Sequence, residues 1–383
     1  MCFRPNVIIN GKFKGGLKNQ IEGAGPLKKQ AEQDMKKMLK SGAAQIVPCG
    51  QCLECRINYA RNWAARCEVE SYYHKNNHFI TLTYDDEHVP VRDIHTKEEY
   101  RGLRNPLDYY GKGKRYENLT LRKEDMQLFL KRLRKWASKN NYYEDPEKGI
   151  RVFYCGEYGS KGERPHYHIL VYGLIIPDLK VECRKKGYEH DSSEIIKKLW
   201  GNGIIDIGGV DYLSCQYVSR YIVKKQLGKD SDAYYEKKGI DKEFIQMSLK
   251  PAIGLEYYLD HSDEIYSIDT IYLKQGRRQR PPRYYDGVED KKQMRLELGD
   301  EEYEYLMELE KAKETFDSEG NYAKPHSAFM TELKMDRREK ATESLFAQME
   351  HTTQGLMEYM KAKETKYENN HKRALMRDVE KLK

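Results

Sequence analysis

The middle of the chain contains the stretch Arg164-Pro165-His166-Tyr167-His168-Ile169-Leu170. Side chains alternate between the two faces of a β-strand, so His166 and His168 would point the same way while Tyr167 points to the opposite face. The apolar and β-branched residues that continue to Val171 favour a strand here. Two imidazoles side by side on one strand face can bind a single metal ion, although a chance pair on a surface strand is the plainer alternative.

A second strand is predicted just upstream, in the stretch Arg151-Val152-Phe153-Tyr154-Cys155-Gly156-Glu157. Residues 158–163, which include Gly, Ser and Lys, would join the two strands as a hairpin loop. If Glu157 lies opposite His166, then Cys155 lies opposite His168, and Glu157 shares a face with both histidines. Two imidazoles and one carboxylate form a facial ligand set with open positions, so this parity favours a metal site.

The composition fits a soluble protein that touches a polyanion on one face. The chain has 383 residues, enough for two or three domains, and a formal net charge of +7. It lacks a run of about 18 apolar residues and the apolar core of a signal peptide, so we expect no membrane segment and a reducing cytoplasm. The eight cysteines are therefore interpreted as thiols or metal ligands before disulfides. No GxxxxGK[ST] phosphate loop is present, so nucleotide hydrolysis is not expected.

Three cysteines form a C-x2-C-x2-C motif at Cys49, Cys52 and Cys55. Folding back through Gly50 would bring their sulfurs within reach of one ion, and a tetrahedral zinc needs a fourth ligand. Cys2 and Cys67 are the candidates, and Cys2 has no other evident purpose so near the end of the chain. We expect a structural zinc here rather than an iron cluster, the alternative being unpaired thiols around a helix start.

The remaining patterns predict an α+β fold, in which an antiparallel sheet is flanked by helices, rather than a doubly wound fold. Residues 1–48 are interpreted as a basic, partly extended arm. The expected elements are a helix over 53–73, a strand over 78–84, a helix from an N-cap at Thr120 to Ser138, a short helix from Ser192 or Ser193 to Trp200, a strand over 204–207, and a helix over 212–227 capped by Asp211.

We expect four segments: an arm with the cysteine-rich helix (1–75), a core (76–230), a basic and Tyr-rich extension (231–287), and a charged helical appendage (288–383) with helices near 301–314 and 344–363. Several clusters of basic residues could contact nucleic acid, or could equally be solvated faces. These clusters are Arg56, Arg61 and Arg66; Lys131, Arg132, Arg134 and Lys135; and the stretch from Arg277 to Tyr285.

The predicted helix after Asp211 carries Tyr217 and Tyr221, which are four residues apart and so emerge on one helix face. Lys224 follows three residues later on the same side. A phenol with a pKa of about 10 is a weak nucleophile near neutral pH unless an ammonium or a metal stabilises its anion. In a chain with 31 tyrosines such a pair is ordinary packing when taken alone.

Together these motifs resemble the HUH endonuclease superfamily, and specifically the rolling-circle replication initiators of small single-stranded DNA phages of the gokushovirus type, a group of microviruses. The matching pieces are Phe79-Ile80-Thr81-Leu82-Thr83, the stretch 164–170, and Tyr217-Val218-Ser219-Arg220-Tyr221-Ile222-Val223-Lys224-Lys225. The segment 49–56 resembles the cysteine-rich N-terminal portion of that phage family. The resemblance covers residues 49–227 and leaves the C-terminal third unmatched.

The resemblance implies that His166, His168 and Glu157 bind a catalytic Mg²⁺ or Mn²⁺ ion. Tyr217 or Tyr221 would attack a phosphate of single-stranded phage origin DNA, on a supercoiled circle, and the second tyrosine would cut the regenerated origin. Lys224 would assist at the transition state. It also implies a host helicase and polymerase as partners, no membrane, and action in the cytoplasm of the infected bacterial host.

Two other classes of protein are consistent with parts of the pattern. A 2-His-1-carboxylate metalloenzyme such as an iron oxygenase shares the ligand chemistry, but gives no reason for the helix with two tyrosines. A non-catalytic, zinc-stabilised nucleic-acid-binding protein would use the cysteines and basic helices without cutting DNA.

Overall fold

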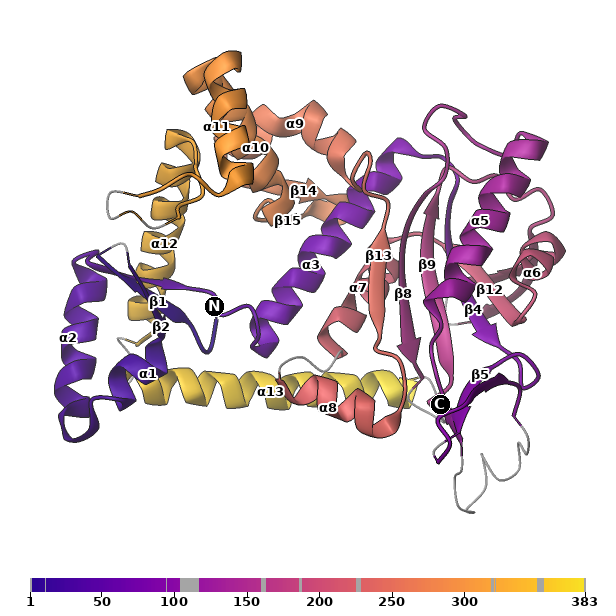
Figure 1. Ribbon diagram of the computed structural model, residues 1–383, viewed down its shortest axis with the longest axis horizontal. Coiled ribbons are helices and arrows are strands. Elements are labelled where there is room, and N and C mark those ends of the chain that lie inside the picture. The colour runs from indigo at the N-terminus through magenta and orange to yellow at the C-terminus, as the bar shows by residue number, and fades with distance from the viewer. Residues whose placement is uncertain are drawn as a thin grey trace. The chain divides into compact units, whose positions relative to one another are not determined.

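The structure is a computed structural model (Figure 1), and it describes residues 2–10, 12–93, 95–103, 117–159, 163–185, 188–224, 229–317, 320, 322–349 and 355–381. Within these ranges the side chains of 117, 183–185, 188–189, 220–224, 229–231 and 371–381 are not described. The chain divides into two compact units, which are described separately below. Unit 1 comprises residues 1–58 and 283–383, and unit 2 comprises residues 59–282. The segments expected from the sequence are thus distributed differently, because the first and last parts of the chain share unit 1.

Unit 2 is built on a 7-stranded sheet in the order β10-β11-β12-β4-β9-β8-β13, and its printed ladders are antiparallel. This is the predicted α+β class. The elements of unit 2, with α3 entering from unit 1, are α3 (Leu53–Glu70), β4 (Asn77–Tyr84), β5 (Pro90–Asp93), β6 (Glu99–Arg101), β7 (Glu117–Leu119), α5 (Lys123–Asn140), β8 (Arg151–Tyr158), β9 (Pro165–Tyr172), β10 (Lys180–Lys185), β11 (Tyr188–Ser192), α6 (Glu194–Trp200), β12 (Gly203–Gly209), α7 (Tyr212–Lys224), α8 (Lys229–Lys238), β13 (Phe244–Met247), α9 (Leu255–Ser267), β14 (Ile271–Leu273) and β15 (Arg277–Gln279).

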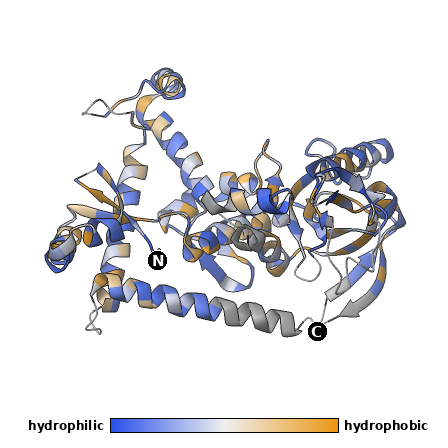
Figure 2. Cartoon of the chain, turned by 60° about the horizontal axis from the view of Figure 1, so that its bottom comes forward, coloured by the Kyte–Doolittle hydropathy of each residue, from blue (hydrophilic) through white to orange (hydrophobic). Residues whose placement is uncertain are grey.

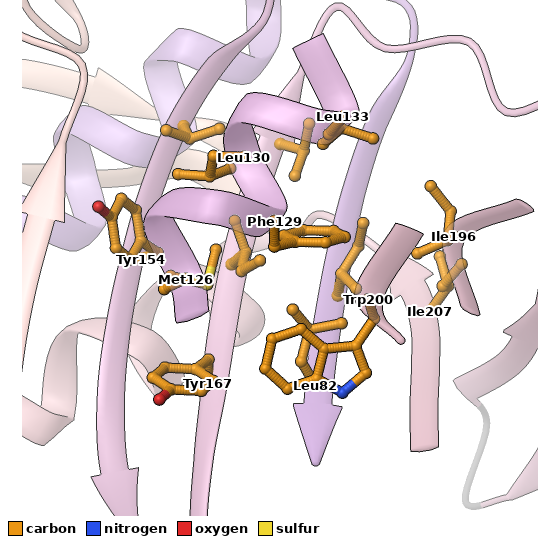
Figure 3. Packing of buried hydrophobic residues seen from close by; sticks show 14 of the residues in the cluster. Leu82, Met126, Phe129, Leu130, Leu133, Tyr154, Tyr167, Ile196, Trp200 and Ile207 are labelled. Carbon is orange, nitrogen blue, oxygen red and sulfur yellow. The ribbon is translucent and has the colours of Figure 1, made fainter. Parts of the chain in front are cut away.

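One face of this sheet packs against α5 and α6 (Figure 3). Phe129 and Leu133 of α5 and Trp200 of α6 are almost completely buried against Leu82 and Tyr167 of the sheet. Burying each large apolar side chain stabilises the fold by about 1.5–3 kcal/mol. Tyr167, the residue between the two histidines, therefore belongs to the main core, as strand alternation predicts.

The opposite face of the sheet is covered in part by α3 and α7, which lie on the other side of β8 and β9 from α5 (Figure 1). We call this the site face, because both histidines of the pair point to it. Ala64 of α3 and Val218 of α7 pack there against Phe153 and Leu170. A buried ion pair between Glu70 at the end of α3 and Arg151 of β8 holds α3 on the sheet, and the backbone N–H of Gly254 also donates to Glu70.

Unit 1 contains a 3-stranded sheet in the order β2-β1-β3. Val7 and Ile46 of this sheet share a core with Leu39, with Leu345 and with Leu356. Along α13, hydrophilic residues prevail beyond the first turns (Figure 2). The elements of unit 1 are β1 (Asn6–Ile9), β2 (Lys12–Gly16), α1 (Leu17–Glu22), α2 (Lys28–Lys40), β3 (Ala44–Val47), α10 (Arg283–Leu298), α11 (Asp300–Ala312), α12 (Ala328–Met349) and α13 (Leu356–Lys381).

Three expectations about local structure were wrong. Residues 1–48 are a folded sheet with helices rather than an extended arm, because the C-terminal helices supply the apolar partners of that sheet. The helix expected over 344–363 is two helices, since α12 ends at Met349 and α13 begins at Leu356. Arg122, not Thr120, is the N-cap of α5, and the Thr120 hydroxyl instead accepts a hydrogen bond from the Asp241 N–H.

The other predicted elements are confirmed to within a few residues. The Ser193 side chain accepts a hydrogen bond from the Ile196 N–H at the start of α6, and Asp211 accepts one from the Ser214 N–H at the start of α7. The expected end of that last helix, at Leu227, lies outside the described residues. None of the helices in the described ranges combines the length and the apolar character needed to cross a lipid bilayer.

Candidate active site

The register of the β8–β9 hairpin is the one predicted from parity. Glu157 pairs with His166, and Cys155 pairs with His168. On the other side of β9, strand β4 places Thr81 directly opposite His168. Because directly opposite residues share a face, the sheet alone brings two imidazoles, a carboxylate and a hydroxyl together on the site face.

The three candidate metal ligands converge on one point. The Nε2 atoms of His166 and His168 lie 2.6 and 3.1 Å from the same oxygen, Oε1 of Glu157. One donor atom from each of the three residues lies within 4.8 Å of the others. Two imidazole nitrogens and one carboxylate oxygen suit a divalent cation and leave positions for other ligands, so the residues present fit the expected metal.

The electrostatics of Glu157 agree with this role. Glu157 is 4% exposed, and burial by itself would raise the pKa of its carboxyl. The hydrogen bonds and positive charge offered by His166 and His168 outweigh that effect and lower the pKa below the ordinary value. The carboxylate is therefore held ionised at the position where a cation would need it.

Each imidazole is oriented by a partner at its other ring nitrogen. Nδ1 of His166 lies 3.1 Å from the carbonyl oxygen of Arg164, and Nδ1 of His168 lies 3.0 Å from Oγ1 of Thr81. An Nδ1–H that donates to oxygen leaves the Nε2 lone pair available, which is the usual arrangement of metal-binding histidines. Sequence reasoning quoted Thr81 within a motif but assigned it no task, although its place on a strand facing the histidine pair was the available signal.

Tyr217 lies beside this cluster. Its ring centroid is 5.1 Å from that of His168 and 6.0 Å from that of Phe79, each at nearly a right angle, while Phe79 stacks on His168. Val218, the next residue of α7, is buried against the sheet, whereas Tyr217 is 42% exposed. The phenol is therefore at the open edge of the ligand cluster, where it can meet a bound polymer.

The other two residues expected on this helix cannot be placed as fully. The backbone of α7 includes positions 221 and 224, but the side chains of Tyr221 and Lys224 lie outside the described residues. Position 221 comes about one helical turn after Tyr217, so the two residues occupy the same side of α7.

Some of the basic residues singled out in the sequence have structural partners. Helix α5 packs on the sheet face opposite the histidine pair, and Arg132 donates hydrogen bonds to the carbonyls of Leu199 and Trp200 at the end of α6. Arg277 forms an ion pair with Glu68 and lies 3.5 Å from the ring centroid of Tyr212. These two arginines stabilise the fold through those contacts.

The predicted cysteine motif also comes together. Cys2, Cys49, Cys52 and Cys55 form a second cluster of potential metal ligands, and all four belong to unit 1. Cys67, the other candidate for the fourth ligand, is instead fully buried in the apolar cluster of unit 2 under α3 and α7.

Comparison with known proteins places the chain in a family. The family model for the replication-associated protein ORF2 matches residues 77–226, the segment that runs from β4 to beyond α7. Replication-associated protein ORF2 of Spiroplasma virus 4 is 32% identical over 268 residues, covering 68% of this chain and 72% of the relative. The chain belongs to this family of replication-associated proteins.

Two further viral relatives agree. The replication-associated protein VP4 of Bdellovibrio phage phiMH2K is 32% identical over 252 residues, which are 65% of this chain and 69% of the relative. Replication-associated protein ORF4 of Chlamydia phage 1 is 27% identical over 245 residues, which are 62% and 52%. No solved structure matches this replication-associated protein. The resemblance to phage replication initiators drawn from the motifs is confirmed at the level of the family, and the matched segment includes the ligand cluster and Tyr217.

Proposed function

We propose that this replication-associated protein is a HUH-type endonuclease that nicks single-stranded origin DNA and later rejoins it, so that circles are released during rolling-circle replication. The observation that carries the proposal is the convergence of His166, His168 and Glu157 on one face of the sheet, with the exposed ring of Tyr217 against His168. Family membership supports a task in replication, and this geometry supports the chemistry.

In the proposed reaction a tyrosine of α7 attacks a phosphorus atom of the DNA backbone. The phenol loses its proton as its oxygen forms a bond to phosphorus, the bond from phosphorus to the 3′ oxygen breaks, and that oxygen takes up a proton. The products are a free 3′-hydroxyl, which can prime synthesis, and a 5′-phosphotyrosine ester. The ester keeps the bond energy for rejoining, because a 3′-hydroxyl can reverse the displacement. Of the two candidates, Tyr217 would act at the ligand cluster that it touches, and Tyr221 would serve in the second cut.

His166, His168 and Glu157 would hold the divalent cation, Mg²⁺ or Mn²⁺, which when bound supplies Lewis-acid polarisation of the scissile phosphate. Thr81 and the Arg164 carbonyl keep the two imidazoles turned so that both Nε2 atoms face the carboxylate. The ammonium of Lys224 would offset negative charge that develops on the phosphate in the transition state.

The same proposal gives the protein its partners and its place of action. Single-stranded origin DNA on a supercoiled phage circle is the substrate, and a host helicase and polymerase would use the exposed 3′-hydroxyl. The reaction would then take place in the cytoplasm of the infected bacterial host, where that machinery is found.

The test is a nicking assay on an origin-bearing circle with Mn²⁺ or Mg²⁺, in which the covalent protein–DNA product is resolved on a denaturing gel. We expect Tyr217→Phe and Tyr221→Phe each to impair the reaction and the double variant to abolish the covalent product. His168→Ala should lose metal-dependent cutting. Tyr305→Phe is the matched control, because Tyr305 is an exposed tyrosine on α11 of unit 1 and should leave cutting unchanged.

Covalent product formed by the double variant would refute tyrosine attack. DNA binding by the intact protein without any nicking, and binding unchanged after removal of both histidines, would instead favour a non-catalytic, zinc-stabilised nucleic-acid-binding protein.

A further inference from the structure

We propose that Cys2, Cys49, Cys52 and Cys55 hold one structural zinc ion, which joins the N-terminal end of the chain to the start of α3. This site lies in unit 1, whereas the ligand cluster of the proposed nuclease lies in unit 2. The proposal is therefore independent of the nicking reaction and concerns the folding of unit 1.

The spacing of the sulfur atoms is that of a tetrahedral zinc site. The four Sγ atoms lie within 4.8 Å of one another, and the Sγ atoms of Cys2 and Cys52 are 3.7 Å apart. Zn–S bonds of about 2.3 Å at the tetrahedral angle separate two sulfurs by about 3.8 Å. A disulfide would need about 2.0 Å, so the sulfurs are arranged around a common centre rather than in a bonded pair.

The backbone around Cys49 is shaped to present sulfur to an ion. Gly50 has a φ of +76°, a left-handed conformation that an L side chain rarely adopts, and it turns the chain back on itself. As a result the N–H groups of Gln51 and Cys52 donate to Sγ of Cys49, at 3.4 and 3.3 Å. The N–H of Cys49 in turn donates to Sγ of Cys2, at 3.3 Å. N–H donors directed at sulfur stabilise the thiolate, the form that binds metal.

The fourth segment of the site is the beginning of α3. Cys55 lies in the first turn of this helix, which starts at Leu53 and extends to Glu70. The positive end of the helix dipole favours an anionic ligand at that position. Zinc bound there would fix the point at which the helix begins.

The consequence for the fold follows from where the ligands come in the chain. Cys2 precedes β1, and Cys49 and Cys52 follow β3, so the ion would close the small sheet that these neighbouring strands form. The sheet contributes few large apolar residues to its core, Val7 and Ile46 among them. Since a small element with a limited core gains most from a cross-link or a metal, zinc binding here should contribute directly to the stability of unit 1.

The experiment measures metal in the full-length protein, purified without added chelator, by inductively coupled plasma mass spectrometry. We expect about one zinc per chain. Replacement of the zinc with Co²⁺ should give the intense visible bands of a tetrahedral four-thiolate site. Cys49→Ser should lose the zinc, and Cys2→Ser, at the end of the chain where unfolding is least expected, should weaken the thiolate-to-cobalt absorption and speed zinc release to a chelator. Cys67→Ala is the matched control, because Cys67 was the rival ligand and is buried elsewhere.

Zinc absent from the wild-type protein, iron in its place, or zinc content that Cys67→Ala lowers and Cys2→Ser leaves unchanged would each overturn the proposal. The two proposals fail separately, since zinc content is measured without DNA. A wild-type protein that holds zinc but does not nick would retain this site and lose the proposed function, and a protein that nicks without zinc would do the reverse.

Discussion

The hydrogen bond between Thr81 and His168 offers the sharpest test of how the ligand cluster is organised. Thr81→Val removes the hydroxyl that lies 3.0 Å from Nδ1 of His168 and keeps a side chain of the same shape. The equivalent support for His166 is the backbone carbonyl of Arg164, which no side-chain substitution removes. The variant therefore releases one imidazole while leaving all three metal ligands in place.

The size of the effect can be worked from the contacts that remain. Loss of a hydrogen-bond partner behind a metal-binding histidine typically costs about 10–100-fold in metal affinity or activity, or about 1.4–2.8 kcal/mol. In this protein the His168 ring is also held by stacking on Phe79, at 5.6 Å between centroids, and by the edge contact with Tyr217. These contacts persist in the variant, so we expect the lower end of the range, about a tenfold weaker metal affinity.

The assay is the nicking rate as a function of Mn²⁺ concentration, together with direct Mn²⁺ binding followed by electron paramagnetic resonance in the absence of DNA. The metal concentration at half-maximal rate should rise about tenfold, with the rate at saturating metal close to that of the wild type. Thr81→Ser keeps the hydroxyl and should behave like the wild type. A lower saturating rate with unchanged metal binding would refute the reasoning, because Thr81 would then act on the DNA rather than through His168.

Three further outcomes are expected. Glu70→Gln should destabilise the protein by about 3–5 kcal/mol in urea unfolding, since it leaves the buried Arg151 without its partner charge. Burial favours a higher pKa for Glu70, but hydrogen bonding by His74 and the charge of Arg151 lower it overall. Its stabilisation is therefore complete above the unfolded pKa of about 4.3, is lost as the pH falls through the folded pKa, and should disappear from the pH profile of the variant. Ser193→Ala should cost about 1 kcal/mol, because the Ile196 N–H loses its capping acceptor, while Ser344→Ala, on α12, should cost much less. Brief treatment with EDTA should abolish nicking, and Mn²⁺ should restore it. A thermal melt and zinc assay of the same sample should show that the zinc remains bound, because four thiolates exchange zinc more slowly than a site with open positions releases its ion.

Much of the candidate site could be predicted from short-range pattern. Alternation along 164–170 placed His166 and His168 on one face, and hairpin parity placed Glu157 beside them, because both depend only on the two-residue repeat of a strand. The C-x2-C-x2-C spacing brought three sulfurs together for the same reason, since a local turn determines their separation. The role of Thr81 was within reach of the same reasoning once β4 was paired with β9.

What the sequence could not supply were contacts between segments far apart in the chain. Nothing local distinguishes Cys2 from Cys67 as the fourth sulfur, and packing decided it by burying Cys67 among apolar side chains. Likewise, residues 1–48 resemble an extended arm until the C-terminal helices provide the apolar surface that their sheet needs.

By itself, then, the sequence determined the strands, their faces and the chemistry of the ligands, because these follow from backbone geometry over a few residues. Only the tertiary structure decided that the ring of Tyr217 lies against His168, that Arg132 caps α6 instead of facing solvent, and that the two ends of the chain share a core. Those outcomes depend on how whole helices pack on a sheet, and many arrangements of similar local sequence compete until side chains far apart in the chain meet.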